Sequence, residues 1–272
     1  MKRILVINDL SYVGRAALMA NIPIISSFGH QVIPCPTVLL TRHTGYDHFK
    51  IHHLNGFFDQ TIDDLIDHHQ PLDGILIGYL DGIHQIGPIM KLLDHYPNTF
   101  VFVDPICADN GKFYHGKDQG YIDALKPLIK RADLIKPNIT EALALCGYDL
   151  TTEITQETIN SLTQQFQASF KSPVLLTGLL RDEKIINLLI NNGHTISFSN
   201  PYIDRYYPGT GDMFDSIIIG SIMDNRSLNN AIQAAINFVL NAIGTMNNET
   251  KQNNLDGCNF EELISSERHI NK

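Results

Sequence analysis

The sequence predicts an α/β fold, with one three-layer α/β/α domain over residues 1–272 and a mostly parallel central sheet. Short, wholly apolar strands at 74–80 and 99–105 are typical of a parallel sheet that is covered on both faces. Strand and helix patterns alternate along the chain, which favours right-handed βαβ units. No internal repeat, low-complexity segment or linker divides the sequence.

The expected elements begin with a strand at 3–7 and a helix at 14–29 that ends at a C-capping glycine. Prolines interrupt the extended segment 30–40, so it is not expected to be a central strand throughout. Asn191-Asn192-Gly193 predicts the turn of a hairpin over 183–199. The remaining expected elements are strands at 133–138 and 172–178 and helices at 61–69, 83–95, 140–147, 212–224, 227–243 and 258–266.

The composition argues against several classes of function. Twenty basic and 29 acidic residues give a net charge of −9, which argues against a nucleic-acid or anionic-membrane partner. No apolar run reaches the 18 or so residues of a membrane span, and the N-terminal run is too short for a signal peptide. The four cysteines lie far apart, which argues against a zinc site or a disulfide framework and for a cytoplasmic location.

Polar residues follow several of the predicted strands, and ligands of α/β folds bind at the carboxyl ends of strands. Asp104, Asp109 and Glu141 in these loops predict a Mg²⁺ site, because Mg²⁺ prefers oxygen ligands and shares itself with phosphates. Taken singly, each acid is more typical of a helix cap or a turn. The polar residues at the strand ends are Asn8, Asp9, Tyr79, Asp104, Asn138, Glu141, Thr177 and Gly178.

The stretch "YYPGTGDMFDSIIIG" (206–220) places two glycines and an acid at the start of an apolar helix, which is expected to be buried. A glycine-rich turn into a helix N-terminus is a ready anion site. Asp212 is open to two interpretations: a first-turn carboxylate that complements the helix dipole, or a general base beside a phosphate that is being transferred.

Five segments together resemble one family. "GTGDMF" (209–214) resembles the GTGD signature of ribokinase-like kinases. "VDPICADNGKFY" (103–114) is similar to "DPVMGDNGKLY" and "IKPNITEA" (135–142) to "ITPNxTEA", both from pyridoxal and pyridoxamine kinases. "PTVLLTRHTGY" (36–46) resembles the substrate loop of these kinases, and "NDLSYVGRAAL" (8–18) their first strand–helix turn. The resemblance covers residues 3 to about 243 and identifies the vitamin B6 kinase branch of the ribokinase-like superfamily.

The resemblance implies a kinase that phosphorylates the 5'-hydroxymethyl group of pyridoxal, pyridoxamine or pyridoxine with ATP and Mg²⁺. Asp212 would be the general base, and the N–H groups of Gly209, Thr210 and Gly211 would receive the phosphoryl group. The other implied roles are substrate contacts by Asp9, Thr44 and Tyr79, nucleotide contacts by Asp104, Asn138, Glu141, Thr177 and Gly178, and Mg²⁺ binding by Asp104, Asp109 and Glu141. A homodimer is implied as well.

The sequence departs from the family pattern at three positions. Asp9 stands where many pyridoxal kinases carry serine, so a different heterocycle stays open as the substrate. Cys107 replaces a methionine and is expected to be a packed apolar side chain. Asp215 replaces an alanine and either complements the helix dipole or weakens phosphate binding.

Two alternatives stay open beside the B6 kinase. One is a kinase of the same fold that acts on hydroxymethylpyrimidine, a precursor of thiamin. The other is a vitamer-binding sensor or carrier without turnover, against which the intact GTGD stretch argues.

Overall fold

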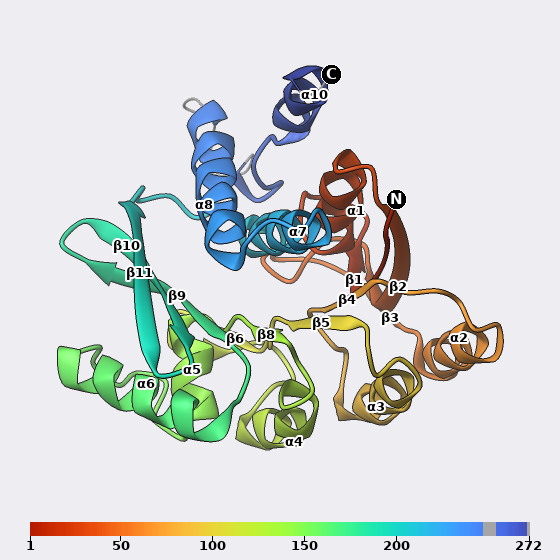
Figure 1. Ribbon diagram of the computed structural model, residues 1–272, viewed down its shortest axis with the longest axis horizontal. Coiled ribbons are helices and arrows are strands. Elements are labelled where there is room, and N and C mark those ends of the chain that lie inside the picture. The colour runs from red at the N-terminus through yellow and green to blue at the C-terminus, as the bar shows by residue number, and fades with distance from the viewer. Residues whose placement is uncertain (247–253, 271–272) are drawn as a thin grey trace. The chain divides into compact units, whose positions relative to one another are not determined.

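The computed structural model describes residues 1–246 and 254–270, and the predicted α/β class is confirmed: mostly parallel strands carry packed helices (Figure 1). The chain divides into two compact units, residues 1–81 with 204–272 and residues 82–203. Each unit has its own strands and helices. The prediction of a single domain over residues 1–272 stays a prediction.

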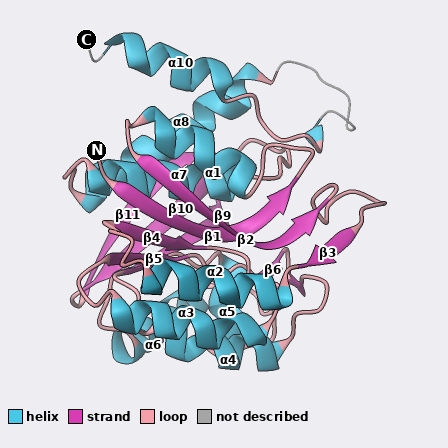
Figure 2. Ribbon diagram, turned by 90° about the vertical axis from the view of Figure 1, so that its right-hand side faces the viewer, coloured by secondary structure: helices cyan, strands magenta, loops and turns pink. Residues whose placement is uncertain are grey.

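The unit formed by the two ends of the chain has the strand order β4-β1-β2-β3. The first three strands are parallel, and β3 runs antiparallel to the end of β2. Helices α1, α7 and α8 lie on one face of these strands and α2 on the other (Figure 2). The elements are β1 (Arg3–Ser11), α1 (Leu18–Ser27), β2 (Gln31–Leu40), β3 (Ile51–His53), α2 (Asn55–Asp67), β4 (Gly74–Ile77), α7 (Thr210–Met223), α8 (Leu228–Thr245) and α10 (Glu261–Ile270).

The strand β2 is continuous, although prolines were expected to interrupt it. Gln31 donates its backbone N–H to Lys2 of the segment that leads into β1, so the N–H groups of even-numbered residues point away from β1. Pro34 and Pro36 are even-numbered, and β3 pairs only with Val38–Leu40. Their missing N–H groups therefore break no ladder bond, as prolines at a sheet edge require.

The helix expected over 14–29 begins four residues later, and this boundary was wrong. Gly14 and Ala17 have φ angles of 104° and 52°, which a helix does not allow. Residues 14–17 therefore form a loop that leads into α1. At the other end, Gly29 has a φ of 82°, as a C-capping glycine should.

The unit of residues 82–203 has the strand order β11-β10-β9-β8-β5. β5, β8 and β9 are parallel, and β9, β10 and β11 form an antiparallel meander. Helices α3 to α6 lie on one face of these strands (Figure 2). The elements are η1 (Ile83–Gln85), α3 (Ile86–His95), β5 (Phe100–Val103), β6 (Ala108–Asp109), β7 (Lys112–Phe113), α4 (Gln119–Ile129), β8 (Leu134–Ile135), α5 (Ile139–Leu145), α6 (Gln156–Ser169), β9 (Val174–Arg181), β10 (Lys184–Asn191) and β11 (His194–Pro201).

The hairpin predicted over 183–199 is confirmed. Asn191 pairs with His194, so the loop between β10 and β11 has two residues. Asn192 and Gly193 both have positive φ angles, of 47° and 78°, which is the conformation of a type I′ turn. The sequence did not predict α4 and α6. Among the described ranges, no helix is long and apolar enough to cross a membrane.

Candidate active site

The N-terminus of α7 is built around Gly209. This residue is the N-cap of the helix and has a φ of 83°, in the left-handed region. A Cβ atom there would lie 2.0 Å from the carbonyl oxygen of Arg15, so only glycine fits between α7 and the loop before α1. Thr210 and Gly211 complete the first turn, whose N–H groups have no partners inside the helix.

Asp212 lies in that first turn, and both of its carboxylate oxygens accept hydrogen bonds. Oδ1 accepts from Nδ2 of Asn8 at 2.9 Å, and Oδ2 accepts from the backbone N–H of Ala17 at 2.8 Å. Asn8 belongs to β1, and Ala17 precedes α1. Two elements outside its own helix therefore orient the carboxylate. A side chain that acts on a bound ligand must be held in such a fixed orientation.

A buried polar network supports this arrangement. Asn21, on α1, accepts from Nδ2 of Asn8 at 3.0 Å and donates to the backbone oxygen of Asp212 at 3.1 Å. Asn21 also donates to Oγ of Ser216 at 2.9 Å. Asn8, Asn21 and Ser216 are almost fully buried. Satisfied buried networks of this kind hold one arrangement, because any alternative leaves a polar group without a partner.

Asp9 lies beside Asp212. Burial and the negative charge of Asp212 raise the pKa of Asp9 to about 7, against a smaller opposing effect of the Ser11 hydroxyl, which donates to Asp9 at 3.1 Å. A carboxyl group with this pKa is present in both protonation states near neutral pH, so it can donate or accept a hydrogen bond.

Tyr79 follows β4 and joins the same region. Its backbone N–H donates to Oδ1 of Asn8 at 2.9 Å, and its carbonyl oxygen accepts from Thr37 at 2.9 Å. Burial, Asp81 and Asp9 together raise the pKa of the Tyr79 hydroxyl to about 12, so the hydroxyl stays protonated. A Cβ at Gly78 would lie 2.8 Å from the Asn8 side chain, so a larger residue there would displace Asn8.

The loop that contains Thr44 is anchored to the C-terminal part of the chain. The His43 ring contacts the carbonyl oxygen of Leu255 at 2.7 Å, and the Tyr46 hydroxyl donates to Asp256. Gly45 donates its N–H to the His43 ring at 3.1 Å, which closes the turn. Thr44 itself is exposed at the tip.

A second cluster lies in the unit of residues 82–203. Asp104 follows β5 and forms an ion pair with Lys136, which follows β8, at 2.8 Å. Both side chains are about 6% exposed. No role was predicted for Lys136, which stands where the family pattern "ITPN" has threonine.

Glu141 and Asn138 form a capping box at the N-terminus of α5. Asn138 accepts from the N–H of Glu141 at 2.9 Å, and Glu141 accepts from the N–H of Asn138 at 2.9 Å. The other oxygen of Glu141 accepts from the N–H of Cys107 at 3.1 Å. Burial, and then the charge of Asp104, raises the pKa of Glu141 well above its ordinary value. The geometry therefore supports the interpretation of Glu141 as a helix-capping residue.

Asp109 lies in β6, and both of its oxygens accept bonds from Asn110. Within residues 1–246 and 254–270, no three His, Cys, Asp or Glu side chains are arranged to hold a metal ion. Asp104 and Glu141, however, lie close enough for one charge to raise the pKa of the other. Two carboxylates fit Mg²⁺ that keeps waters and phosphate oxygens as its other ligands.

Thr177 and Gly178 both lie within β9, which continues to Arg181, so the prediction that they follow this strand was wrong. The N–H of Thr177 donates to the carbonyl oxygen of Pro137 at 3.0 Å, and Thr177 pairs with Asn138 in a parallel bridge. Gly178 has a φ of 79° and is exposed. Thr177 and Gly178 therefore lie next to the capping box of Asn138.

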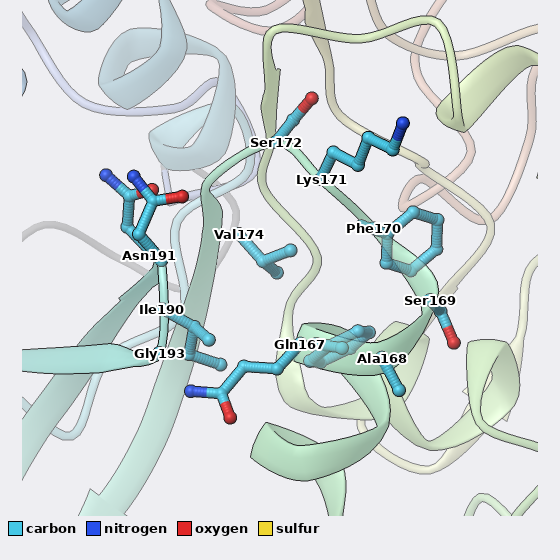
Figure 3. Close-up of a pocket in the computed structure, with 12 residues that line it drawn as sticks. Gln167, Ala168, Ser169, Phe170, Lys171, Ser172, Val174, Ile190, Asn191 and Gly193 are labelled. Atoms are coloured by element: carbon cyan, nitrogen blue, oxygen red, sulfur yellow. The ribbon is translucent and has the colours of Figure 1, made fainter.

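A pocket lies away from these two clusters, between the end of α6 and the turn that joins β10 to β11 (Figure 3). None of the residues predicted for the site lines it.

Cys107 is buried, and burial raises the pKa of its thiol, which agrees with a packed apolar side chain. Asp215 is buried on α7.

The sequence did not predict roles for Asn21, Ala17, Lys136 or Asn8. Asn8 was expected after the first strand, but it lies within β1. Asn21 lies inside an apolar helix pattern, where an asparagine is unusual and is itself a signal. Ala17 acts through its backbone, so no sequence pattern could indicate it.

Residues 14–256 match the family described as phosphomethylpyrimidine kinase, which is most of the chain. The chain belongs to the phosphomethylpyrimidine kinase family. The predicted resemblance to pyridoxal kinases of the ribokinase-like superfamily is confirmed, and the chain is a kinase of the group that includes pyridoxal and hydroxymethylpyrimidine kinases.

Relatives of the chain include both pyridoxal kinases and hydroxymethylpyrimidine kinases. A pyridoxal kinase from Dictyostelium discoideum is 26% identical over 82% of this chain and 79% of its own length. A hydroxymethylpyrimidine/phosphomethylpyrimidine kinase from Aquifex aeolicus is 25% identical over 85% of this chain and 89% of its own length. A crystal structure from Bacteroides thetaiotaomicron, provisionally named a phosphomethylpyrimidine kinase, contains pyridoxal. It is 29% identical, with a TM-score of 0.89 over 98% of this chain and 96% of that one.

Proposed function

We propose that this kinase transfers the γ-phosphoryl group of ATP to the 5'-hydroxymethyl group of pyridoxal, pyridoxamine or pyridoxine. The observation that carries the proposal is the Asp212 carboxylate, held by Asn8 and by the N–H of Ala17 at the N-terminus of α7. Such a carboxylate accepts the proton of the attacking hydroxyl group. The pyridoxal-containing structure of a 29% identical relative supports the choice of substrate.

The residues around Asp212 receive the remaining roles. The N–H groups of Gly209, Thr210 and Gly211 stabilise the negative charge that develops on the phosphoryl oxygens. Asp9 and Tyr79 contact the pyridine ring or its hydroxyl. The charge of Asp212 raises the pKa of Asp9, and the charge of Asp9 raises the pKa of Tyr79, so both side chains lie near the base. Thr44 contacts the substrate from its anchored loop.

The second cluster receives the nucleotide. Asn138, Thr177 and Gly178 contact its phosphates, as the family resemblance implies. Asp104 and Glu141 hold Mg²⁺ together with phosphate oxygens, and Asp109 stays a further predicted ligand. When bound, Mg²⁺ neutralises phosphate charge. The proposal includes a cytoplasmic location, which the widely separated cysteines favour, and a homodimer, which the family resemblance implies. Light scattering in solution tests the oligomeric state.

Release of ADP from Mg-ATP in the presence of pyridoxal tests the proposal, with the product identified by mass as a phosphate ester. We expect stoichiometric ADP and ester. Tight pyridoxal binding without ADP would instead indicate a carrier or sensor.

The second candidate function is phosphorylation of hydroxymethylpyrimidine. Asp9 favours it, because a carboxyl group with a pKa near 7 also suits an aminopyrimidine, which presents both a donor and an acceptor. Several relatives bear this name. Parallel turnover of both substrate classes separates the two candidates.

A further inference from the structure

The ion pair of Asp104 and Lys136 follows from the strand register. Phe102 pairs with Leu134 and Val103 with Ile135 in the parallel strands β5 and β8. Continuing this register by one residue places Asp104 beside Lys136, and the N–H of Lys136 donates to the carbonyl oxygen of Val103 at 3.0 Å. The side-chain contact of 2.8 Å is therefore built into the sheet.

The surroundings of the pair explain why a cation is needed there. Asp104, Glu141 and Lys136 are all buried, and Lys136 contacts Asp104 at 2.8 Å. The buried carboxylate of Asp104 thus has the Lys136 ammonium group as its partner, because an isolated buried charge is strongly unfavourable.

A divalent cation and an ammonium group compete for the same carboxylate oxygens. The residues that fit Mg²⁺ are Asp104 and Glu141, and one oxygen of Asp104 is in contact with Lys136. Both oxygens of Glu141 accept backbone N–H groups, from Asn138 and Cys107. In the protein alone, a cation must therefore compete with the Lys136 ammonium group at Asp104 and with a backbone N–H at each oxygen of Glu141.

We propose that Lys136 is the resident counter-ion of Asp104 and keeps a divalent cation from binding to the protein alone, so that the cation enters only together with a phosphate-bearing nucleotide. The nucleotide part of this inference rests on the proposed function. The competition between Lys136 and the cation does not, because it concerns only the three side chains.

Titration of the protein with Mn²⁺, without nucleotide or vitamer, tests the inference. The free ion is followed by electron paramagnetic resonance. We expect weak binding by the wild-type protein. Lys136→Met should bind one Mn²⁺ more tightly by about tenfold or more, because a carboxylate has lost its competing cation. Lys136→Arg keeps the positive charge and should behave as wild type.

Lys126→Met is the matched control, since this lysine pairs with Asp123 at 2.7 Å on the exposed face of α4. It should leave Mn²⁺ affinity unchanged. Equal affinity of wild type and Lys136→Met, or a tight wild-type site that Asp104→Asn abolishes, would overturn the inference.

The wild-type titration decides even if Lys136→Met does not fold. Weak binding that Asp104→Asn leaves unchanged supports the inference, and a fall in affinity contradicts it. Since no vitamer or nucleotide is present, these results do not depend on which substrate the kinase uses.

Discussion

The backbone N–H of Ala17 donates to Oδ2 of Asp212 across 2.8 Å, although 195 residues separate the two in sequence. Ala17 has a φ of 52°, a conformation that non-glycine residues seldom adopt. The loop before α1 thus has an uncommon backbone shape, and that shape orients the carboxylate. Such local strain persists where surrounding contacts determine it and is frequent at functional sites.

Replacement of Asp212 by asparagine tests the base. Asp212→Asn cannot accept the hydroxyl proton, and its amide group would face donors from Asn8 and Ala17. We expect kcat to fall by about 10²- to 10⁴-fold, with the fold retained by circular dichroism. Asp59→Asn, on the exposed face of α2, is the control and should keep wild-type kcat. A near-wild-type kcat in Asp212→Asn would remove this residue from the mechanism.

Replacement of Gly209 by alanine tests the close approach of α7 to the loop before α1. The added Cβ would lie 2.0 Å from the Arg15 carbonyl oxygen and would require an unfavourable φ. We expect a loss of about 1–3 kcal/mol of unfolding free energy in urea titrations, together with loss of activity. Gly56→Ala is the matched control. Gly56 lies in α2 with open space around it, so this variant should be neutral or gain up to about 1 kcal/mol. Equal stability of the two variants would contradict the packing described.

The raised pKa of Asp9 predicts a pH dependence of stability. An acid whose pKa rises on folding, here from 3.8 to about 7, binds more protons in the folded state between these values. Stability therefore falls as pH rises through this window and levels off above about 7. We expect wild type to lose about 1–3 kcal/mol between pH 5 and pH 8 relative to Asp9→Asn, measured by urea unfolding. Parallel pH profiles of the two proteins would show that Asp9 titrates normally.

The anchor of the Thr44 loop predicts an effect on substrate affinity. Asp256→Asn weakens the bond from the Tyr46 hydroxyl and loosens the loop. We expect KM for the vitamer to rise by about tenfold while KM for ATP stays unchanged. Tyr46→Phe should have the same effect, and the double variant should be no worse than either single one, because the two residues share one interaction. Additive effects, or a change in KM for ATP alone, would argue against the anchor.

The sequence predicted those parts of the site that depend on local pattern. Asp212 at the start of a buried helix and Asp104 directly after β5 follow from periodicity and from the rule for α/β folds. Asp9 was expected after the first strand but lies within β1, which continues to Ser11. It did not predict Asn21 as a partner of Asn8 or Ala17 as a donor, because these contacts join distant segments. The ion pair of Lys136 and Asp104 depends on the register of β5 and β8, and periodicity does not specify register across a crossover.

The most direct test of the proposed function is the ratio of kcat/KM for pyridoxal to kcat/KM for hydroxymethylpyrimidine, from ADP release with Mg-ATP under identical conditions. Pyridoxamine and pyridoxine are measured in parallel. We expect a B6 vitamer to have the highest kcat/KM, which would assign Asp9 to the pyridine side of the pocket. Highest turnover on hydroxymethylpyrimidine would contradict the B6 assignment and would leave the fold and the role of Asp212 in place.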